Sequence, residues 1–417
     1  MKKLGRLALL AIVSFTLINC ASDDEETTTP TPFTLVTKRQ VIDQYANVVL
    51  QNYTKALQDA QAMKTAITTF TTTPTEANFT AAKNAWLFAR DSYGTTEAFR
   101  ECNGPVDTDQ SSSTPWGIGN EGQMNAWPID ESYIDYVSAG TEPYAGTYGA
   151  GSIINDTSIT ISIATLTDPN NFGGNESQND KSISTGWHAI EFLLWGQDNT
   201  SPSANLPGQR SFTDYTTAAN ADRRRQYLDV VTQLLINDLQ ELVNTWSTGG
   251  TYATVFAGLD EDVALRQLIN GAFFIAGDEL SSERIIAPVD SIDGIDGSGQ
   301  EDEHSCFSDN TDKDIVANTQ GVYNVIFGRY GSSTGASFYD LVKQVDEAQA
   351  QKLLEAANEA LAKVNAIDNN AQPFDYLITQ ETSMDSTLGI VMQSVKALQD
   401  WADEISASAT VIGINLQ

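Results

Sequence analysis

The sequence predicts an all-α protein made of two helical halves packed together, with long irregular loops between the helices. Apolar residues recur at steps of three, four or seven over several long stretches, as expected where one face of a helix is buried. Hydrophobic residues make up 41% of the 417 residues, which suffices for globular folding. A chain of this length exceeds one small core, so two domains or one large helical array are expected.

The N-terminus is typical of a bacterial lipoprotein. Basic residues precede an apolar stretch that ends in the sequence LINC, which is similar to a lipobox. We expect residues 1–19 to be a signal peptide and Cys20 to be lipidated, because the apolar run is too short for a membrane span. Residues 20–36 are acidic and then rich in Thr and Pro, which predicts a tether. The expected location is the cell envelope, anchored to the outer membrane on its periplasmic side or at the cell surface.

The net charge of −32 indicates which classes of partner are compatible with the surface of this protein. Such a surface repels phosphates, so we expect no nucleic-acid partner. It is compatible with attracting cations, and equally with keeping a secreted protein soluble. Beyond the lipobox, Cys102 and Cys306 either pair in an oxidising envelope or stay as free thiols. The composition does not indicate an oligomeric state.

The expected helices follow from the apolar stripes in chain order. Thr73-Pro74-Thr75-Glu76 predicts a capping box, with the proline at the first helical position of the second helix. Ile159, Ile161 and Ile163 alternate and predict either a short strand or a small helix. The apolar stripes span residues 42–67, 79–93, 228–246, 354–364 and 391–405.

Loops rich in Gly, Ser, Asn and Asp separate these helices. Loops of such length in a compact protein tend to be functional or covering segments. We place the boundary between the halves in one of them, residues 197–218, so that the N-terminal half is 37–200 and the C-terminal half is 201–417. The other long loops are expected at residues 103–127, 138–152, 166–180 and 287–311.

The chain has only two histidines, and each lies beside carboxylates. In the sequence GWHAIE, His188 and Glu191 are three residues apart and share one helical face, so imidazole and carboxylate can converge. Gly186 allows close approach of backbone or ligand before the helix. Two ligands are too few for a zinc site, so metal binding requires at least one more from elsewhere. The alternative is a buried His–Glu hydrogen bond between helices. The HExxH and HxxEH peptidase motifs are absent.

A second polar row lies at Trp86, Arg90, Tyr93 and Glu97, whose spacing puts all four on one helical face. One interpretation is a polar wall facing the first histidine, with Glu97 as a further metal ligand. The other is an ion pair between Arg90 and Glu97.

The second histidine, His304, lies in the acidic segment 300–309, which also contains Asp302, Glu303 and Asp309. This density of carboxylates predicts a site for a hard or borderline cation, or else a solvated acidic loop. The interleaved Cys and Phe at 306 and 307 favour a segment tucked against the body of the protein.

These motifs resemble the imelysin family and, within it, the iron-regulated protein A branch. The resemblance extends over about residues 40–330. It implies an all-helical fold of two bundle-like halves, an envelope location, a link to iron acquisition and a GxHxxE motif near the junction of the halves. The family is also classed among metallopeptidases. The matching segments are Ala85–Trp86 with Arg90, Tyr93 and Glu97, Trp127–Asp130 with Tyr133–Tyr136, Ser184–Gly196, Arg223–Leu228 and Gln300–Asp309.

We therefore expect an envelope lipoprotein that binds a metal ion, iron or zinc, or a metal-bearing small ligand during iron uptake. His188 and Glu191 would be primary metal ligands, with Glu97 as a third. One alternative is a metallopeptidase in which Glu191 or Glu97 is the base for a metal-bound water. Another is a surface binding module without metal. The remaining candidate ligand-binding residues are Trp86, Arg90, Tyr93, Asp130, Gly186, Asp302, Glu303, His304 and Asp309.

Overall fold

The periodic stretches fold as helices in the computed structural model of the chain, which describes residues 35–138, 152–167, 182–292, 297–384 and 388–416. Within these ranges the only strands are a short antiparallel pair, β1 (Arg329–Tyr330) and β2 (Ser333–Thr334). The predicted all-α class is therefore confirmed. The signal peptide 1–19, Cys20 and most of the tether 20–36 lie outside the described residues.

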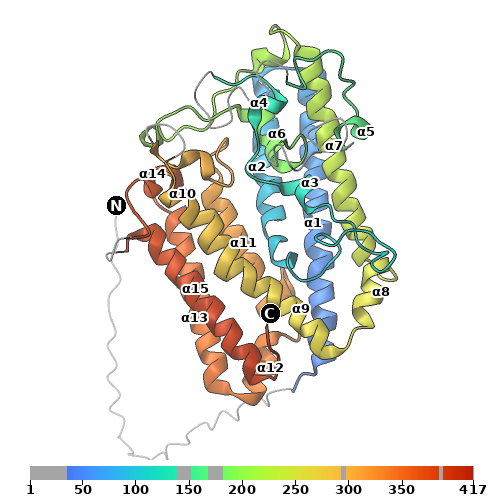
Figure 1. The fold of residues 1–417 in the computed structure, drawn as a ribbon, viewed down its shortest axis with the longest axis vertical. Coiled ribbons are helices and arrows are strands. Elements are labelled where there is room, and N and C mark those ends of the chain that lie inside the picture. The colour runs from blue at the N-terminus through green and yellow to red at the C-terminus, as the bar shows by residue number, and fades with distance from the viewer. Residues whose placement is uncertain (1–34, 139–151, 168–181, 293–296, 385–387, 417) are drawn as a thin grey trace, which may run out of the picture. The chain divides into compact units, whose positions relative to one another are not determined.

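One set of helices packs around the long helix α1 (Lys38–Thr72). Helices α2 (Glu76–Gly94) and α7 (Ala221–Trp246) lie along it, as Figure 1 shows. The shorter α6 (Gly186–Trp195) lies against both α2 and α7. All residues of α6 are buried, so its apolar residues occur on more than one side rather than along one stripe.

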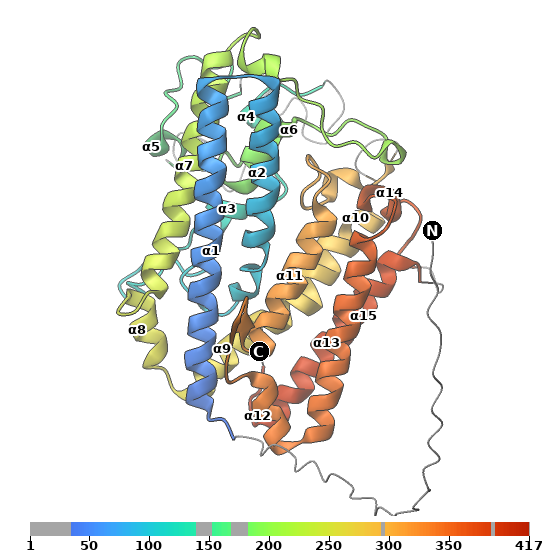
Figure 2. The same cartoon turned by 180° about the vertical axis from the view of Figure 1, so that it is seen from behind.

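A second set follows in the chain and packs around α15 (Ile390–Val411). Helix α13 (Glu347–Asp368) and the π-helical segment η4 (Ile275–Ile286) lie against α15, and α11 (Thr311–Ile326) lies against both of them. Figure 2 shows α11, α13 and α15 side by side. The flanking elements are α9 (Glu261–Phe274), α10 (Ala287–Asp290), α12 (Phe338–Val345) and α14 (Phe374–Ile378), whereas α8 (Thr251–Ala257) lies against α7 and α1 of the first set.

The two sets meet where α11 packs against α2 and where α9 packs against α1. Helix α7, which follows residue 200, lies along α1 and so belongs to the first set. The division at 197–218 into halves 37–200 and 201–417 stays a prediction. The connecting segments contain several short elements: η1 (Glu97–Phe99), α3 (Glu121–Asn125), α4 (Glu131–Ile134), α5 (Ile163–Leu166), η2 (Pro202–Ala204), η3 (Phe212–Tyr215) and η6 (Gln300–Asp302).

Two local expectations are settled by hydrogen bonds at helix starts. Helix α2 begins at Glu76, and its N-cap is Thr75, whose side chain accepts from the backbone N–H of Asn78 at 3.2 Å. The prediction that Pro74 occupies the first helical position is wrong, because the capping residue follows the proline. The isoleucine alternation at 159–163 leads into the short helix α5, capped by Ser162, and not into a strand.

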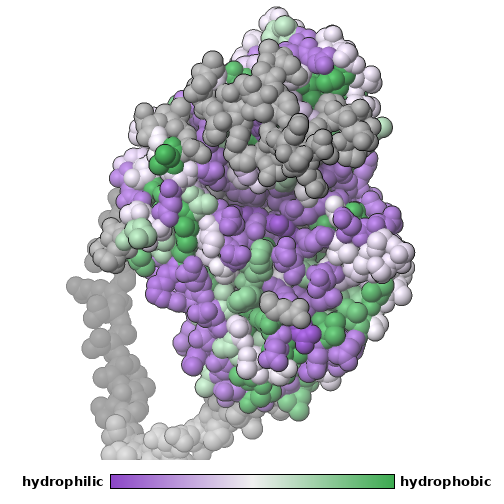
Figure 3. All heavy atoms as spheres, in the orientation of Figure 1, coloured by the Kyte–Doolittle hydropathy of each residue, from purple (hydrophilic) through white to green (hydrophobic). Residues whose placement is uncertain are grey.

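The surface between the two sets is hydrophilic. In Figure 3 polar residues gather around a recess in the middle of the face shown. Among the described helices, none is both long and apolar enough to cross a membrane.

The core of the first set contains an aromatic cluster in which Phe70 of α1 contacts Phe79 and Tyr215, with ring centroids 4.8 Å away in each case. Because Phe70 is fully buried, we expect Phe70→Ala to lower the free energy of unfolding by about 3–5 kcal/mol. The matched control Phe88→Ala, at a side chain that is 59% exposed, should change it by less than about 1 kcal/mol. Urea denaturation followed by circular dichroism measures both. Equal losses would contradict the assignment of this core.

Candidate functional site

The GxHxxE segment forms the first turns of α6. Gly186 has a φ of +85°, and a Cβ added there would lie 2.3 Å from the carbonyl oxygen of Met124. Only glycine fits this backbone and this close approach, so α6 begins directly against α3. One turn later, His188 Nδ1 lies 3.0 Å from Glu191 Oε2, as the spacing predicted. Both side chains are buried.

The Glu191 carboxylate is fully engaged within the protein. Besides His188, it accepts hydrogen bonds at Oε1 from the backbone N–H of Ser308 at 3.0 Å and from the Ser308 hydroxyl at 2.7 Å. Burial raises the pKa of Glu191 to about 8 and lowers the pKa of His188 well below its usual value. Burial therefore disfavours the charged form of both groups.

The second histidine lies against the first. The rings of His188 and His304 are 4.8 Å apart between centroids, in an edge-to-face arrangement. His304 Nδ1 is 3.0 Å from Asp314 Oδ2 and 3.1 Å from Arg90 Nη2. Burial and the charge of Arg284 lower the pKa of His304 to about 4, so this imidazole is also neutral at pH 7.

A buried ion pair holds His304 in place. Arg90 of α2 donates from Nη2 to Asp314 Oδ2 at 2.9 Å and from Nε to Oδ1 at 3.1 Å, and both side chains are 1% exposed. Ser305 Oγ donates to the same carboxylate at 2.7 Å. Burial alone would raise the pKa of Asp314, but Arg90 and the hydrogen bond with His304 keep it well below its usual range. Asp314 is therefore an ionised acceptor for the His304 Nδ1–H.

Glu97 belongs to a neighbouring network of charges. Its Oε2 accepts from Arg284 Nη2 at 2.6 Å and from Arg100 Nη1 at 3.1 Å. Burial alone would raise the pKa of Glu97, but these two arginines lower it to about 2. The expected Arg90–Glu97 ion pair does not form, because α2 ends at Gly94 and Glu97 lies in η1. Glu97 as a metal ligand stays a prediction.

Asn125 joins the two networks. Its side-chain oxygen accepts from Arg90, and its Nδ2 donates to Glu97 Oε1 at 3.3 Å. The other members of the predicted row, Trp86 and Tyr93, pack against Trp187 with ring centroids 6.1 and 5.2 Å away. These two aromatic side chains therefore support α6 from behind rather than facing the histidines.

The remaining sequence candidates have distinct surroundings. Asp130 caps α4, where it accepts from the backbone N–H of Ser132 at 3.0 Å. Asp302 accepts from Ser291 Oγ and lines the pocket described below. Glu303 is buried, and Asp309 lies in the turn before α11 with a φ of +54°.

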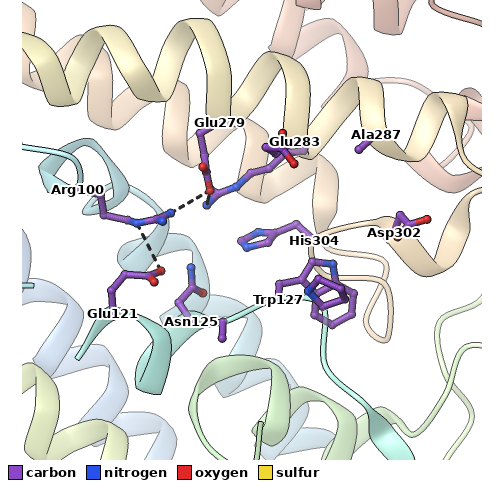
Figure 4. Close-up of a pocket in the computed structure, with 12 residues that line it drawn as sticks. Arg100, Glu121, Asn125, Trp127, Glu279, Glu283, Ala287, Asp302 and His304 are labelled. Carbon is purple, nitrogen blue, oxygen red and sulfur yellow. Dashed lines mark hydrogen bonds and ion pairs between the residues drawn. The ribbon is translucent and has the colours of Figure 1, made fainter. Parts of the chain in front are cut away.

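A pocket of about 350 Å³ opens beside His304, between α3 and the η4 segment. Figure 4 shows the His304 ring projecting into the space bounded by Arg100, Asn125 and Glu279. Arg100 bridges Glu121 and Glu279 across this space, at 3.4 and 2.9 Å. The other lining residues are Ala126, Trp127, Pro128, Glu283, Arg284, Ala287 and Asp302.

Several residues around the site could not be identified as functional from the sequence. Glu279 and Arg284 bond at 2.8 Å although they are five residues apart, because the π-helical turns of η4 place such residues on one face. Asp314 lies on a different element from both of its partners, Arg90 and His304. The Trp127 ring packs 4.8 Å from His188, and the sequence pointed to it only as part of a matched segment.

Comparisons with known proteins identify the family and support this architecture. The family model described as Peptidase M75, imelysin, matches residues 49–400. The chain belongs to the imelysin family. This imelysin is 24% identical over 332 residues to iron-regulated protein A of Synechococcus elongatus, covering 76% of this chain and 72% of the relative. Its fold is similar to a crystal structure from Parabacteroides distasonis, of a protein named as an iron-regulated protein A precursor. That comparison has a TM-score of 0.68 at 17% identity and covers 91% of this chain and 96% of the other.

The two cysteines of this imelysin that lie within the described ranges are free thiols. Cys102 and Cys306 are both buried and do not pair. Cys102 Sγ donates to the carbonyl oxygen of Phe99, and burial raises its pKa to about 12. Of the two alternatives for these residues, the structure has the free thiols.

The close approach at Gly186 can be tested by substitution. We expect Gly186→Ala to destabilise the protein by more than about 3 kcal/mol, because the new Cβ would collide with the backbone at Met124. Gly249→Ala is the matched control, since its φ is +80° but its Cβ would meet nothing within 4 Å. The free energy of unfolding of the control should fall by only about 1–2 kcal/mol, the cost of placing alanine in a left-handed backbone conformation. Denaturant unfolding of both variants separates the effect of the collision from that of conformational strain. Equal losses of unfolding free energy in the two variants would refute the close contact of Gly186 with the backbone at Met124.

Proposed function

We propose that this imelysin binds a transition-metal ion, or a small ligand that carries one, at the histidine pair beside the pocket, as part of iron acquisition. The observation that carries the proposal is the meeting of two neutral, buried imidazoles, His188 and His304, next to a polar pocket. Neutral imidazole is the form that binds metals, and it suits iron and zinc.

The hydrogen bonds of the pair favour metal coordination through Nε2. Nδ1 of His188 is occupied by Glu191, and Nδ1 of His304 by Asp314. A carboxylate on one ring nitrogen is the usual way in which proteins orient a metal-binding histidine. The Nε2 atom of His188 is buried and has no hydrogen-bond partner in the described part of the chain. In this arrangement the histidines are the ligands, and Glu191 is the residue that positions His188.

Two imidazoles leave coordination positions for other donors. No third carboxylate, imidazole or thiol of the described residues lies close enough to the pair to complete a metal site, so the bound ligand would supply oxygen donors of its own. The volume of about 350 Å³ is at the lower end of small-molecule sites, which favours a compact ligand.

Binding is favoured over peptide hydrolysis, although the family model carries a peptidase designation. A general base must be free to take a proton from water. Both Glu191 oxygens are already bonded, to His188 and to Ser308, and both Glu97 oxygens are bonded, to Asn125 and two arginines. Neither of the two bases expected from the sequence is therefore free.

Equilibrium dialysis of the purified protein against ferrous iron and zinc tests the proposal. We expect His188→Ala and His304→Ala each to abolish high-affinity binding, because each removes a ligand. Glu191→Gln should weaken binding by about 10–100-fold, because it disturbs only the orientation of His188. Asp403→Asn, at an exposed carboxylate on α15, is the control and should bind as the wild type does.

Unchanged metal binding in the His188→Ala, His304→Ala double variant would overturn this site. Cleavage of a peptide library that is abolished both by chelator and by His188→Ala would instead establish the peptidase. Purified protein that binds no metal, with unaltered stability after chelator treatment, would favour a metal-free binding module.

We further propose that Cys20 carries a lipid that anchors the protein to the outer membrane. The lipobox-like sequence LINC and the acidic, Thr/Pro-rich segment that follows support this location. The full-length precursor produced in a Gram-negative host should incorporate labelled palmitate and sediment with membranes. The Cys20→Ser variant should do neither, whereas Cys102→Ser, at a buried thiol, should behave as the wild type. Membrane association that survives Cys20→Ser would contradict the anchor.

A further inference from the structure

Three aspartates from distant parts of the chain converge at a second place. Asp198 follows α6, Asp309 precedes α11, and Asp375 lies in α14. One carboxylate oxygen from each lies within 4.8 Å of the other two. Asp198 is 2% exposed and Asp375 is 3% exposed. Such burial of like-charged groups costs free energy unless a cation or protons compensate for it.

No basic side chain in the described ranges forms an ion pair with any of the three aspartates. Burial, together with the charges of its two neighbours, raises the pKa of Asp309 to about 9. Burial and the charge of Asp198 also raise the pKa of Asp375, to about 7. Burial and mutual charge thus disfavour the ionised form of these carboxyl groups.

Two further buried oxygens lie at this cluster without partners. Gln300 donates from Nε2 to Asp198 Oδ2, while its Oε1 has no hydrogen-bond partner among the described residues. Oδ2 of Asp375 likewise has no partner there. The Gln300 and Asp375 side chains are 1% and 3% exposed. Unpartnered acceptors this deeply buried are rare in native proteins and require an explanation.

We propose that Asp198, Asp309 and Asp375, with Gln300 beside them, form a binding site for calcium, a hard divalent cation. All donors are oxygens, which calcium prefers and which contrast with the imidazoles of the histidine pair. Calcium binds oxygen at about 2.3–2.6 Å, so opposite ligands lie about 4.6–5.2 Å apart. Magnesium, by contrast, usually keeps several waters and is seldom held by an all-protein set of ligands.

A cation at this site would fix the position of residues 300–309, the segment that carries the second histidine. One of its donors, Gln300, precedes His304, and Asp309 follows it. Within the same segment Ser308 holds Glu191. A cation bound here links the segment to the chain that follows α6 and to α14. It therefore restrains the segment that positions both histidines.

Calorimetric titration of the full mature protein with calcium alone tests this inference. We expect saturable binding of one calcium ion per chain, weaker binding of magnesium, and a rise of the melting temperature with calcium. Asp309→Asn and Asp375→Asn should each weaken calcium binding at least tenfold. Asp238→Asn is the matched control, because Asp238 is also a buried aspartate with a raised pKa but lies on α7, where Gln123 is its partner.

The asparagine variants should fold, because they keep the shape of the side chain and remove a buried repulsion. Without calcium, Asp309→Asn should melt at or above the temperature of the wild type, yet it should lose the rise caused by calcium. The His188→Ala, His304→Ala double variant should bind calcium normally, so failure at the histidine pair and failure here are distinguishable. No saturable calcium binding by the wild type, or unchanged binding by Asp309→Asn and Asp375→Asn, would overturn the proposal.

Discussion

The Arg90–Asp314 ion pair is the interaction on which the centre of this protein depends. It joins α2 of the first helical set to α11 of the second, with both side chains 1% exposed. A buried pair of this kind is tolerated only when its remaining hydrogen-bonding groups are satisfied. Here His304, Ser305 and Asn125 satisfy them. The junction between the helical sets and the position of the second histidine are therefore one structural feature.

The segment 300–309 connects everything else to that junction. It contributes His304 to the histidine pair, Ser308 to the carboxylate of Glu191, and oxygens to the aspartate cluster. These ten residues therefore contribute to three sites. This explains why the stretch is dense in carboxylates and yet largely buried, in contrast to a solvated acidic loop. The repulsion among these carboxylates is the cost that a bound cation would offset.

Much of the fold was predictable because helix periodicity is a local property. The buried faces of α2, α7 and α15 are the stripes expected from their sequences, while on α13 the buried face includes Leu353 and Ala360 in place of the expected Leu354 and Leu361. The start of α2 also differs from expectation. Two threonines flank Pro74, and only the geometry of the turn decides which of them caps the helix.

The sequence alone determined the all-α class and placed His188 and Glu191 on one helical face, because both depend on local periodicity, whereas the need for a glycine at 186 depends on the backbone of Met124 in a distant segment. It also marked His304 as a candidate. Only the tertiary structure decided that the two histidines touch and that Glu97 pairs with arginines of other elements. Contacts between distant segments depend on how helices pack, and no local pattern of residues encodes that geometry.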